Sequence, residues 1–442
     1  MLKEKIGYSY NDVTLVPEII SNISSRLECN PFTSEKWLPI FTAPMASVVN
    51  TDNLDQFINN GINPILPRNI NFETRKLHLK DQTWVALSLK EFENLFIDNA
   101  EQMTDDFRTH YFIVVDIANG HMKSLYSKCY EAKKLAIKYG YKLTIMTGNI
   151  ANSGTYRWIC DLNYTAKTRI IDFIRVGIGG GSGCITTSNV SIHYPQASLI
   201  NECYKEKKWA KTLRDDLGEP KYDESLFPKI VADGGIRNYD HVIKALALGA
   251  DYVMIGSLFA QCIESAGEKT TKSLSTKLPL RFPIERYKNF STDSKGNFKA
   301  YYTDDFINDI IKPWKWKLMD AEDNIKNGKY TKDSSEYKLA VLEYENKLNE
   351  LKEQKMIGQI DVKFFGMASA DGQKSISGEK TKTAEGITKW LPVKYTLAGW
   401  TENMISYLRS AMSYTDCETI NEFIGKPDLI VNSISEIQAV NK

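Results

Sequence analysis

The chain lacks the features that mark membrane, secreted and strongly nucleic-acid-binding proteins. It has no run of about 18 apolar residues, so the sequence predicts no membrane span. Its first residues, MLKEKIGYSYNDV, contain no apolar core of the kind found in secretory signals. Neither sign of charge is in excess, because 56 Lys and Arg face 55 Asp and Glu. This balance argues against binding dominated by a phosphate backbone, but it allows a local basic pocket for one small phosphorylated ligand.

Cysteines are also few. There are seven in 442 residues, an odd number with no CxxC pair, so a reducing, cytoplasmic setting with free thiols is expected. Most of them are expected to be inert core residues. Hydrophobic residues make up 42% of the chain and charged residues 25%, which is ordinary for a globular protein and excludes global disorder.

Eight short apolar runs recur, each followed by a polar or glycine-rich loop and then a helical pattern. They are LPIFTA (38–43), INPIL (62–66), WVALSL (84–89), YFIVVD (111–116), KLTIMT (142–147), IIDFIRV (170–176), KIVAD (229–233) and DYVMIG (251–256). Such runs indicate parallel strands buried on both faces. Eight successive units predict an α/β fold, a (β/α)8 TIM barrel, with a doubly wound open sheet as the alternative. In the barrel, the chemistry is expected on the loops after the strands.

The pattern breaks after the eighth unit, from about Glu268 to Asp361, where apolar runs are scarce. Residues 333–355 have a helical period, and 303–328 are expected to form a partner helix, making a helical hairpin without a chemical motif. The apolar stripe expected on the first of these consists of Tyr337, Leu339, Leu342, Leu348 and Leu351. The predicted organisation is a barrel core over 1–267, an inserted helical segment over 268–361, and an active-site flap with a C-terminal return over 362–442.

The segment VGIGGGSGCITT (176–187) is the most informative in the chain. Its five glycines allow positive φ and close approach of a ligand. Successive N–H groups in such a loop cradle an anion, and its exposed carbonyls suit a monovalent cation. Cys184 lies in this loop rather than in a strand. A thiol among N–H donors is expected to ionise more readily, so we favour a nucleophile over a buried spectator.

Two more glycine motifs follow the next two predicted strands. Asp233-Gly234-Gly235 places a carboxylate and two glycines at a strand end, and Gly256-Ser257 precedes a helix. In barrels the loops after the seventh and eighth strands commonly bind phosphate. A carboxylate accepts two hydrogen bonds and therefore suits ribose hydroxyls. Together with the cysteine loop, the set predicts a site for a nucleoside monophosphate.

These motifs resemble those of the IMP dehydrogenase and GMP reductase family. The resemblance covers almost the whole chain outside 268–361. It is carried by SYNDVTLVP (9–17), PIFTAPM (39–45), VVDIANGH (114–121), TGNIA (147–151), VGIGGGSGCITT (176–187), VADGGI (231–236), GADYVMIGSLFA (249–260) and FGMAS (365–369). It implies a (β/α)8 barrel, a nicotinamide cofactor, a potassium ion and a homotetramer.

The choice within the family rests on the stretch after residue 370. The dehydrogenases carry an Arg-Tyr pair on a mobile flap that activates water, whereas residues 370–383 here contain neither Arg nor Tyr. The following Ala384-Glu385-Gly386 resembles a reductase motif. The resemblance therefore implies an NADPH-dependent reductase that converts GMP to IMP and ammonia. The alternatives are an IMP dehydrogenase, an enzyme acting on a modified purine nucleotide, and a non-catalytic nucleotide-binding barrel.

The resemblance also implies roles for individual residues. Cys184 would be the nucleophile, while Thr186 and Glu385 would form the dyad that protonates and releases ammonia. The substrate would contact Ser182, Asp233, Gly234, Gly235, Gly256, Ser257, Gly366, Met367, Ala368, Lys382 and Gly386. The cofactor would contact Arg68, Asp116, Ile117, Ala118, Asn149, Ile178 and Gly179. The carbonyls of Gly179, Gly181 and Cys184 would hold potassium. A solvated surface charge is the alternative for Glu385, and an exposed salt bridge is the alternative for Arg68.

Four departures from the family pattern bear on the substrate. They are Met45-Ala-Ser-Val48 in place of Met-Asp-Thr-Val, Gly-Gly-Gly-Ser in place of Gly-Pro-Gly-Ser, Lys382 in place of an arginine, and Phe365 in place of a tyrosine. Lysine keeps the charge but loses the bidentate geometry of arginine. The departures concern the identity of the nucleotide more than the fold.

Overall fold

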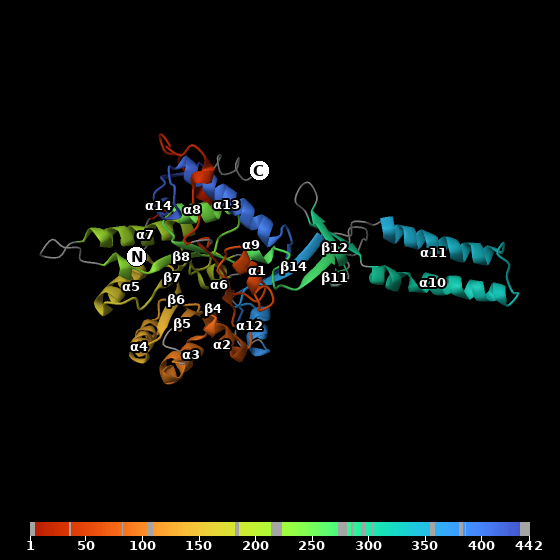
Figure 1. Cartoon of the computed structure of the whole chain (residues 1–442), viewed down its shortest axis with the longest axis horizontal. Helices are drawn as coiled ribbons and strands as arrows, with labels where there is room; N and C mark the ends of the chain where they lie inside the picture. The colour runs from red at the N-terminus through yellow and green to blue at the C-terminus, as the bar shows by residue number, and fades with distance from the viewer. Residues whose placement is uncertain are drawn as a thin grey trace. The chain divides into compact units, whose positions relative to one another are not determined.

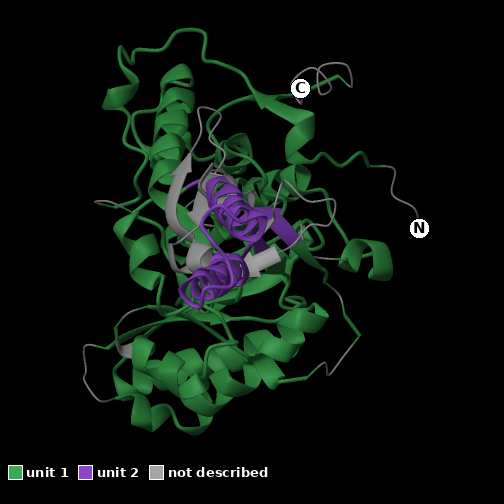
Figure 2. Ribbon diagram, turned by 90° about the vertical axis from the view of Figure 1, so that its right-hand side faces the viewer, with its two compact units in different colours: residues 1–267, 364–389, 396–442 green, residues 268–363, 390–395 purple. Residues whose placement is uncertain are grey.

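The structure is a computed structural model of the chain (Figure 1). It describes residues 5–34, 37–81, 83–104, 109–181, 185–213, 223–272, 281–283, 287–292, 298–302, 304–353, 359–379, 383–384 and 386–433. The chain divides into two compact units, shown in Figure 2. Unit 1 comprises residues 1–267, 364–389 and 396–442, and unit 2 comprises residues 268–363 and 390–395.

Unit 1 is built on a sheet of eight strands, all parallel, in the order β2-β9-β8-β7-β6-β5-β4-β3. The strands are β2 (Ile40–Thr42), β3 (Ile65–Leu66), β4 (Trp84–Leu87), β5 (His110–Val115), β6 (Lys142–Ile150), β7 (Phe173–Val176), β8 (Lys229–Asp233) and β9 (Tyr252–Ile255). Each coincides with one of the eight apolar runs of the sequence. The strand prediction is therefore confirmed.

The two outer strands of this sheet meet, so the sheet closes into a barrel. Asn63, just before β3, forms a parallel bridge with Phe41 of β2. The Asn63 N–H donates to Ile40 O at 3.0 Å, and the Thr42 N–H donates to Asn63 O at 3.0 Å. The Thr42 hydroxyl then accepts from the Ile65 N–H at 2.9 Å. The (β/α)8 barrel is confirmed, and the open doubly wound sheet is excluded.

Helices lie between successive strands and surround the sheet in Figure 1. They are α1 (Leu54–Asn59), α2 (Phe72–Lys80), α3 (Leu89–Glu93), α4 (Lys123–Tyr139), α5 (Ser153–Ala166), α6 (Thr186–Val190), α7 (Gln196–Thr212), α8 (Tyr239–Ala247) and α9 (Ser257–Ala260). Local sequence sets their ends: Asn152 accepts from Gly154 N–H at 2.9 Å at the start of α5, and Gly140 ends α4 with φ 81°. Among the described helices, none combines the length and the hydropathy that a membrane span requires.

The barrel interior is packed with side chains rather than open. Phe41, Trp84 and Phe173 form an edge-to-face cluster with ring centroids 5.3–5.8 Å apart. Met254 and Met146 belong to the same buried core as this cluster. Alternating inward positions of parallel strands fill a barrel of this size, as observed here. Packed side chains therefore close the barrel interior below the carboxyl ends of the strands.

The two termini of unit 1 are joined by a short antiparallel pair. Strand β1 (Val13–Leu15) pairs with β16 (Leu429–Val431). Three helices complete the unit: α12 (Ala370–Ser377), α13 (Leu397–Tyr414) and α14 (Ile420–Phe423). Trp400 of α13 is fully buried and stacks on Tyr239 of α8, with ring centroids 5.4 Å apart. The C-terminal part of the chain is thus packed onto the barrel helices.

Unit 2 contains strands and a helical hairpin. The strands β10 (Lys269–Lys272), β11 (Arg281–Pro283), β14 (Gln359–Phe365) and β15 (Thr388–Pro392) form a sheet in the order β11-β10-β14-β15, and β12 (Tyr287–Thr292) pairs with β13 (Phe298–Tyr302). The helices are α10 (Asp304–Lys326) and α11 (Ser335–Glu353). They run antiparallel, with Lys317 paired to Glu343 at 3.2 Å and Lys347 5.5 Å from the Trp314 ring.

Two details of unit 2 differ from the sequence prediction. The strands β10–β13 were not expected, because polar sequences such as KTTK and YKNFST contain no apolar run. The expected apolar stripe of α11 is also wrong in part: Leu339 and Leu342 are 56% and 53% exposed. Ala340, which was not part of the predicted stripe, is buried instead. The stripe was assigned from hydrophobicity alone.

Candidate active site

A cavity of about 1090 Å³ opens at the carboxyl ends of the barrel strands. It is larger than most single-ligand pockets, which occupy roughly 300–1,000 Å³. Every predicted site residue that the structure describes lines it. These are Arg68, Asp116, Ile117, Ala118, Asn149, Ile178, Gly179, Gly181, Thr186, Asp233, Gly234, Gly235, Gly256, Ser257, Gly366, Met367, Ala368 and Gly386. The structure therefore brings motifs from distant parts of the sequence to one place.

Four predicted residues lie outside the described part of the chain: Ser182, Cys184, Lys382 and Glu385. Their neighbours in sequence are described. Gly181 and Thr186 line the cavity, as do Thr383 and Gly386. The roles assigned to the four residues stay predictions.

A buried arginine organises the centre of the cavity wall. Arg175, on β7, is 9% exposed and bridges two carboxylates. Its Nη1 lies 2.9 Å from Asp116 Oδ1, and its Nη2 and Nε lie 2.9 Å from Asp233 Oδ2. Burial disfavours the charge on Arg175, but the attraction of Asp233 and Asp116 outweighs it and raises the pKa of Arg175 above its ordinary value. The three charges hold the ends of β5, β7 and β8 in register.

Asn149 extends this network to the glycine loop. Its Nδ2 donates to Asp233 Oδ2 at 2.7 Å and to Gly177 O at 2.8 Å. Asp233 Oδ2 therefore accepts from both Arg175 and Asn149, while Oδ1 accepts no hydrogen bond from the described residues. A carboxylate fixed through one oxygen keeps the other for a ligand, and adjacent ribose hydroxyls suit such an acceptor.

The loops after β7 and β8 pack directly against each other because both are glycine-rich. Gly177 has φ 135°, and a Cβ there would collide with Asp233 O. Gly234 has φ 97°, and a Cβ there would lie 3.2 Å from the Gly181 N. Only glycine fits both the backbone conformation and the close approach at these positions. The result is a stretch of exposed backbone lining the cavity, which suits a phosphate group.

The N-terminal motif SYND (9–12) is connected to the loop after β8, which contains Gly235 and is predicted to bind phosphate. His241 Nδ1 lies 3.0 Å from Gly235 O, and its Nε2 lies 2.8 Å from Asn11 Oδ1. Tyr10 is buried against His241, with ring centroids 5.2 Å apart. Burial lowers the pKa of His241 below its ordinary value. The N-terminal segment thus fixes the position of Gly235.

A second group of residues closes the cavity from the side of α12. The Ser369 hydroxyl accepts from the Gly372 N–H at 3.1 Å and starts this helix. The Ala46 N–H lies 3.5 Å from the Met367 sulfur, which joins the loop after β2 to the loop after β14. The stretch 370–383, which corresponds to the flap of the dehydrogenases, thus begins with the helix α12 (Ala370–Ser377). Gln373 and Ser377 of α12 line the cavity.

The side of the cavity formed by the loops after β3 to β5 fits a polar cofactor. Arg68 Nη1 donates to Asp116 O at 3.2 Å, and its Nε is buried without a hydrogen-bond partner. Its Nη1 also lies 3.9 Å from Asp116 Oδ2, in an ion pair whose two side chains are partly exposed, so the salt-bridge alternative for Arg68 stays open. Arg68 and Asp116 both line the cavity here, so a guanidinium and a carboxylate are available to a polar ligand.

Two of the three carbonyl groups predicted to bind potassium, those of Gly179 and Gly181, belong to described residues. Gly179 O accepts from the Thr187 hydroxyl at 3.2 Å, so one of its lone pairs is already used. A carbonyl oxygen has a second lone pair that is available to a cation. Gly181 lies two residues further along the same loop and lines the cavity. Among the described residues there is no cluster of three or more His, Cys, Asp or Glu side chains suited to a metal.

Several residues that line the cavity were not predicted from the sequence. Arg175 was hidden inside the run IIDFIRV, which was interpreted as a strand. The run carries two charged residues, Asp172 and Arg175, and charges in a strand buried on both faces are the signal that would have drawn attention to it. Arg237, Ser88, Gln373 and Ile376 also line the cavity, and no motif marked them.

Comparisons with known proteins agree with this geometry. The family model described as "IMP dehydrogenase / GMP reductase domain" matches residues 7–278. The chain is 29% identical over 276 residues to the GMP reductase of Pediococcus pentosaceus, covering 59% of this chain and 73% of that protein. It is 30% identical over 275 residues to the GMP reductase of Staphylococcus epidermidis, with the same coverage. It is also 35% identical over 136 residues to the inosine-5'-monophosphate dehydrogenase of Tritrichomonas foetus, covering 30% of this chain and 23% of that protein.

Proposed function

Because the chain belongs to the IMP dehydrogenase / GMP reductase family, we propose that it is an oxidoreductase of the GMP reductase type. The reaction is GMP plus NADPH plus a proton giving IMP, ammonia and NADP⁺. The observation that carries the proposal is the single cavity in which Asp233 and the glycine loops adjoin the Arg68–Asp116 side. One side suits a nucleoside monophosphate and the other a nicotinamide cofactor, so a substrate carbon and a hydride donor would meet between them.

The proposed chemistry uses the chain's own residues as follows. The Cys184 thiolate attacks C2 of the purine, so that a C–S bond forms. The C2–N bond then breaks, and the amine leaves as ammonia after taking a proton from the Thr186–Glu385 dyad. The cofactor supplies a hydride to C2 when it is bound. The C–S bond breaks, which releases IMP and restores the thiolate.

The described residues would position the two ligands. Asp233, held through Oδ2 by Arg175 and Asn149, would accept from the ribose hydroxyls. Gly235 and the Gly256-Ser257 backbone would hold the phosphate, and the helix start at Ser257 adds favourable partial charge. Met367 and Gly386 would contact the base. Both line the cavity, and Gly386 is itself the last residue of the reductase-like Ala384-Glu385-Gly386.

Steady-state assays test the proposal directly. Oxidation of NADPH in the presence of GMP, with release of ammonia, is expected. Reduction of NAD⁺ by IMP, without any GMP reduction, would identify a dehydrogenase instead. Nucleotide binding without turnover in either direction would identify a non-catalytic barrel. The same assay with modified guanine nucleotides would test whether Lys382 and Phe365 alter the choice of substrate.

Replacing Glu385 by glutamine is expected to slow ammonia release by about 10²–10⁴-fold, because the amine is a poor leaving group without a proton donor. Thr186→Ala should cause a similar loss. Since the two would act as one relay, the double variant should be little worse than either single variant. Single-turnover measurements that follow the purine adduct and NADPH consumption separately would show this. Ammonia release at the wild-type rate in Glu385→Gln would contradict the dyad.

We also propose a potassium ion bound by the carbonyls of Gly179, Gly181 and Cys184. Titrating K⁺ into cation-free buffer should raise the rate, whereas a flat response would remove this ion from the mechanism.

The family resemblance further supports a homotetramer. Sedimentation should then give about four times the chain mass of 50.3 kDa, and a species of 50.3 kDa alone would contradict it.

A further inference from the structure

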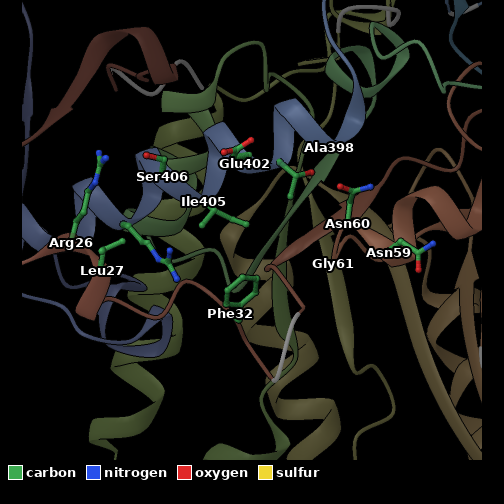
Figure 3. Close-up of a pocket in the computed structure, with 12 residues that line it drawn as sticks. Arg26, Leu27, Phe32, Asn59, Asn60, Gly61, Ala398, Glu402, Ile405 and Ser406 are labelled. Atoms are coloured by element: carbon green, nitrogen blue, oxygen red, sulfur yellow. The ribbon is translucent and has the colours of Figure 1, made fainter.

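Two solvent-exposed features lie outside the candidate active site. The first is a groove of about 510 Å³ in unit 1, between the 3₁₀ helix η2 (Arg26–Glu28), the end of α1 and α13 (Figure 3). Its charged side chains Arg26 and Glu402 are exposed, so the groove belongs to the ordinary surface of this unit. The second is Trp316 on α10 of unit 2, which is 65% exposed, more than any other described tryptophan.

Trp316 lies on the side of the helical hairpin that is turned away from its own partner helix. The helices α10 and α11 lie side by side in Figure 1. Trp314 and Ala321 of α10 face α11, because Lys347 lies 5.5 Å from the Trp314 ring and Ala321 is buried. An α-helix turns by about 100° per residue, so Trp316 and Met319 lie about 200° and 140° round the helix from Trp314. They therefore point away from α11, and Met319 is 50% exposed.

This exposed pair has the composition of a protein contact. Tryptophan and methionine are enriched in interface cores, and tryptophan is prominent among the residues that dominate binding free energy. The helix α11 also has an exposed apolar pair, Leu339 and Leu342 at 56% and 53%, but leucine is under-represented among such residues. The pair on α10 is therefore the stronger candidate for a contact.

Charged residues of opposite sign flank the apolar pair of α10 along one edge. Lys315 and Glu322 are both exposed. They are seven residues apart, so they lie within about 20° of each other round the helix. Together with Trp316 and Met319 they form what we call the outer face of α10. An edge that is basic at one end and acidic at the other is complementary to an inverted copy of itself.

We propose that the outer face of α10 binds the same face of a second copy of this chain, with the two helices antiparallel. A two-fold axis between residues 317 and 318 places Trp316 opposite the partner's Met319, and Met319 opposite the partner's Trp316. In such a pair equivalent edges of the two helices adjoin. Lys315 then lies within about 3 Å, measured along the helix axis, of the partner's Glu322. The contact thus pairs both the apolar and the charged residues of the face.

The antiparallel direction follows from the size of the side chains. In a parallel pair Trp316 would meet the partner's Trp316, so two large indoles would compete for the same space. The antiparallel pair sets each indole against a narrower and more adaptable methionine. The charge pattern alone allows both directions, because a parallel pair would place Lys315 beside the partner's Asp320.

The expected strength of this contact is set by its size. Two helix faces of about two turns each bury less than roughly 1,200 Å², at the low end of specific interfaces. Association through α10 should therefore be weak and should depend on protein concentration. The contact uses residues of unit 2 alone, so it would come in addition to the proposed homotetramer.

Sedimentation of the full chain over a range of concentrations tests the proposal. The wild-type mass should rise with concentration to about twice its starting value or more, because a two-fold contact joins assemblies in pairs. The double variant Trp316→Ser/Met319→Ser should weaken this association by about tenfold or more. Leu339→Ser/Leu342→Ser, the matched control on α11, should associate as the wild type does. No rise for the wild type, or an equal loss in the control variant, would overturn the proposal.

Charge reversal tests the antiparallel direction. Lys315→Glu brings two acidic side chains together at each end of the contact and should weaken association by about tenfold. Adding Glu322→Lys restores opposite charges on this edge, so the double variant should associate as the wild type does. Restoration by Asp320→Lys instead would show that the helices pair in parallel and would overturn the arrangement. GMP reduction should be the same in all of these variants, because none of the changed residues lines the active-site cavity. The assay of the proposed function therefore reads out separately from this contact.

Discussion

Replacing Cys184 by alanine is expected to abolish turnover, with a loss of at least about 10³-fold, while nucleotide binding is retained. The proposed reaction passes through a bond between this sulfur and C2 of the purine, and alanine has no atom that can form it. The phosphate and ribose contacts proposed for Gly235 and Asp233 do not involve the thiol, so binding should survive. Stopped-flow assays and calorimetric titration with GMP measure the two effects separately.

The other cysteines provide the control for this prediction. The six described cysteines are buried, and none forms a disulfide. Burial raises the pKa of Cys129 and Cys160 to about 12, so these thiols are protonated and unreactive near pH 7. Alkylation should therefore inactivate the wild type by modifying Cys184, and Cys160→Ala should keep its activity. If Cys184→Ala retains a tenth of the wild-type rate, the assignment of the nucleophile is wrong.

Replacing Arg175 by methionine is expected to destabilise the protein by about 3–5 kcal/mol, because two carboxylates lose the charge that holds them together. Asp116 and Asp233 would then face each other across β7 without a cation between them. Urea denaturation at pH 7 measures the loss. Arg169→Met, which changes an arginine near the start of the same strand, is the matched control and should cost much less.

The effect of Arg175 on catalysis follows from the same contacts. Arg175→Lys keeps a positive charge but does not reproduce the three contacts of the guanidinium. Its stability should be partly restored, while KM for the nucleotide should rise, because Asp233 is no longer fixed on two sides. A variant with wild-type stability and KM would show that the network has no positioning role.

Much of the barrel was predictable because its signals are local and strong. Strands such as β5 and β9 are continuous apolar runs, and a parallel strand buried on both faces requires this pattern. The loops that line the cavity were predictable for the same reason: Gly177 and Gly234 occupy backbone conformations that other residues rarely adopt. Their proximity in space then follows from barrel geometry, which places all βα loops at one end.

What the sequence did not reveal depends on contacts between distant segments. Arg175 stands out in the sequence only as a charge in an apolar run, and its partners Asp233, at the end of β8, and Asp116, just after β5, become known only from the structure. Tyr10 and Asn11 belong to a motif whose function becomes clear through His241, more than 200 residues away. The strands β10 and β14 define each other by pairing, and the polar sequence KTTK gives no sign of it.

The pairing of β10 with β14 also makes the inserted segment 273–358 separable from the rest of the chain. Lys272 lies directly opposite Gln359 in this antiparallel pair, so the chain leaves and returns at the same rung of the ladder. Neighbouring strands are only about 5 Å apart, a gap that a two-residue turn closes. Residues 273–358 can therefore be excised and replaced by an Asn-Gly linker without cutting any strand of the barrel. A gene could therefore gain, lose or exchange this segment through sequence changes at two nearby joints. The register of β14 would stay the same, and so would the course of the chain into Gly366 and Met367.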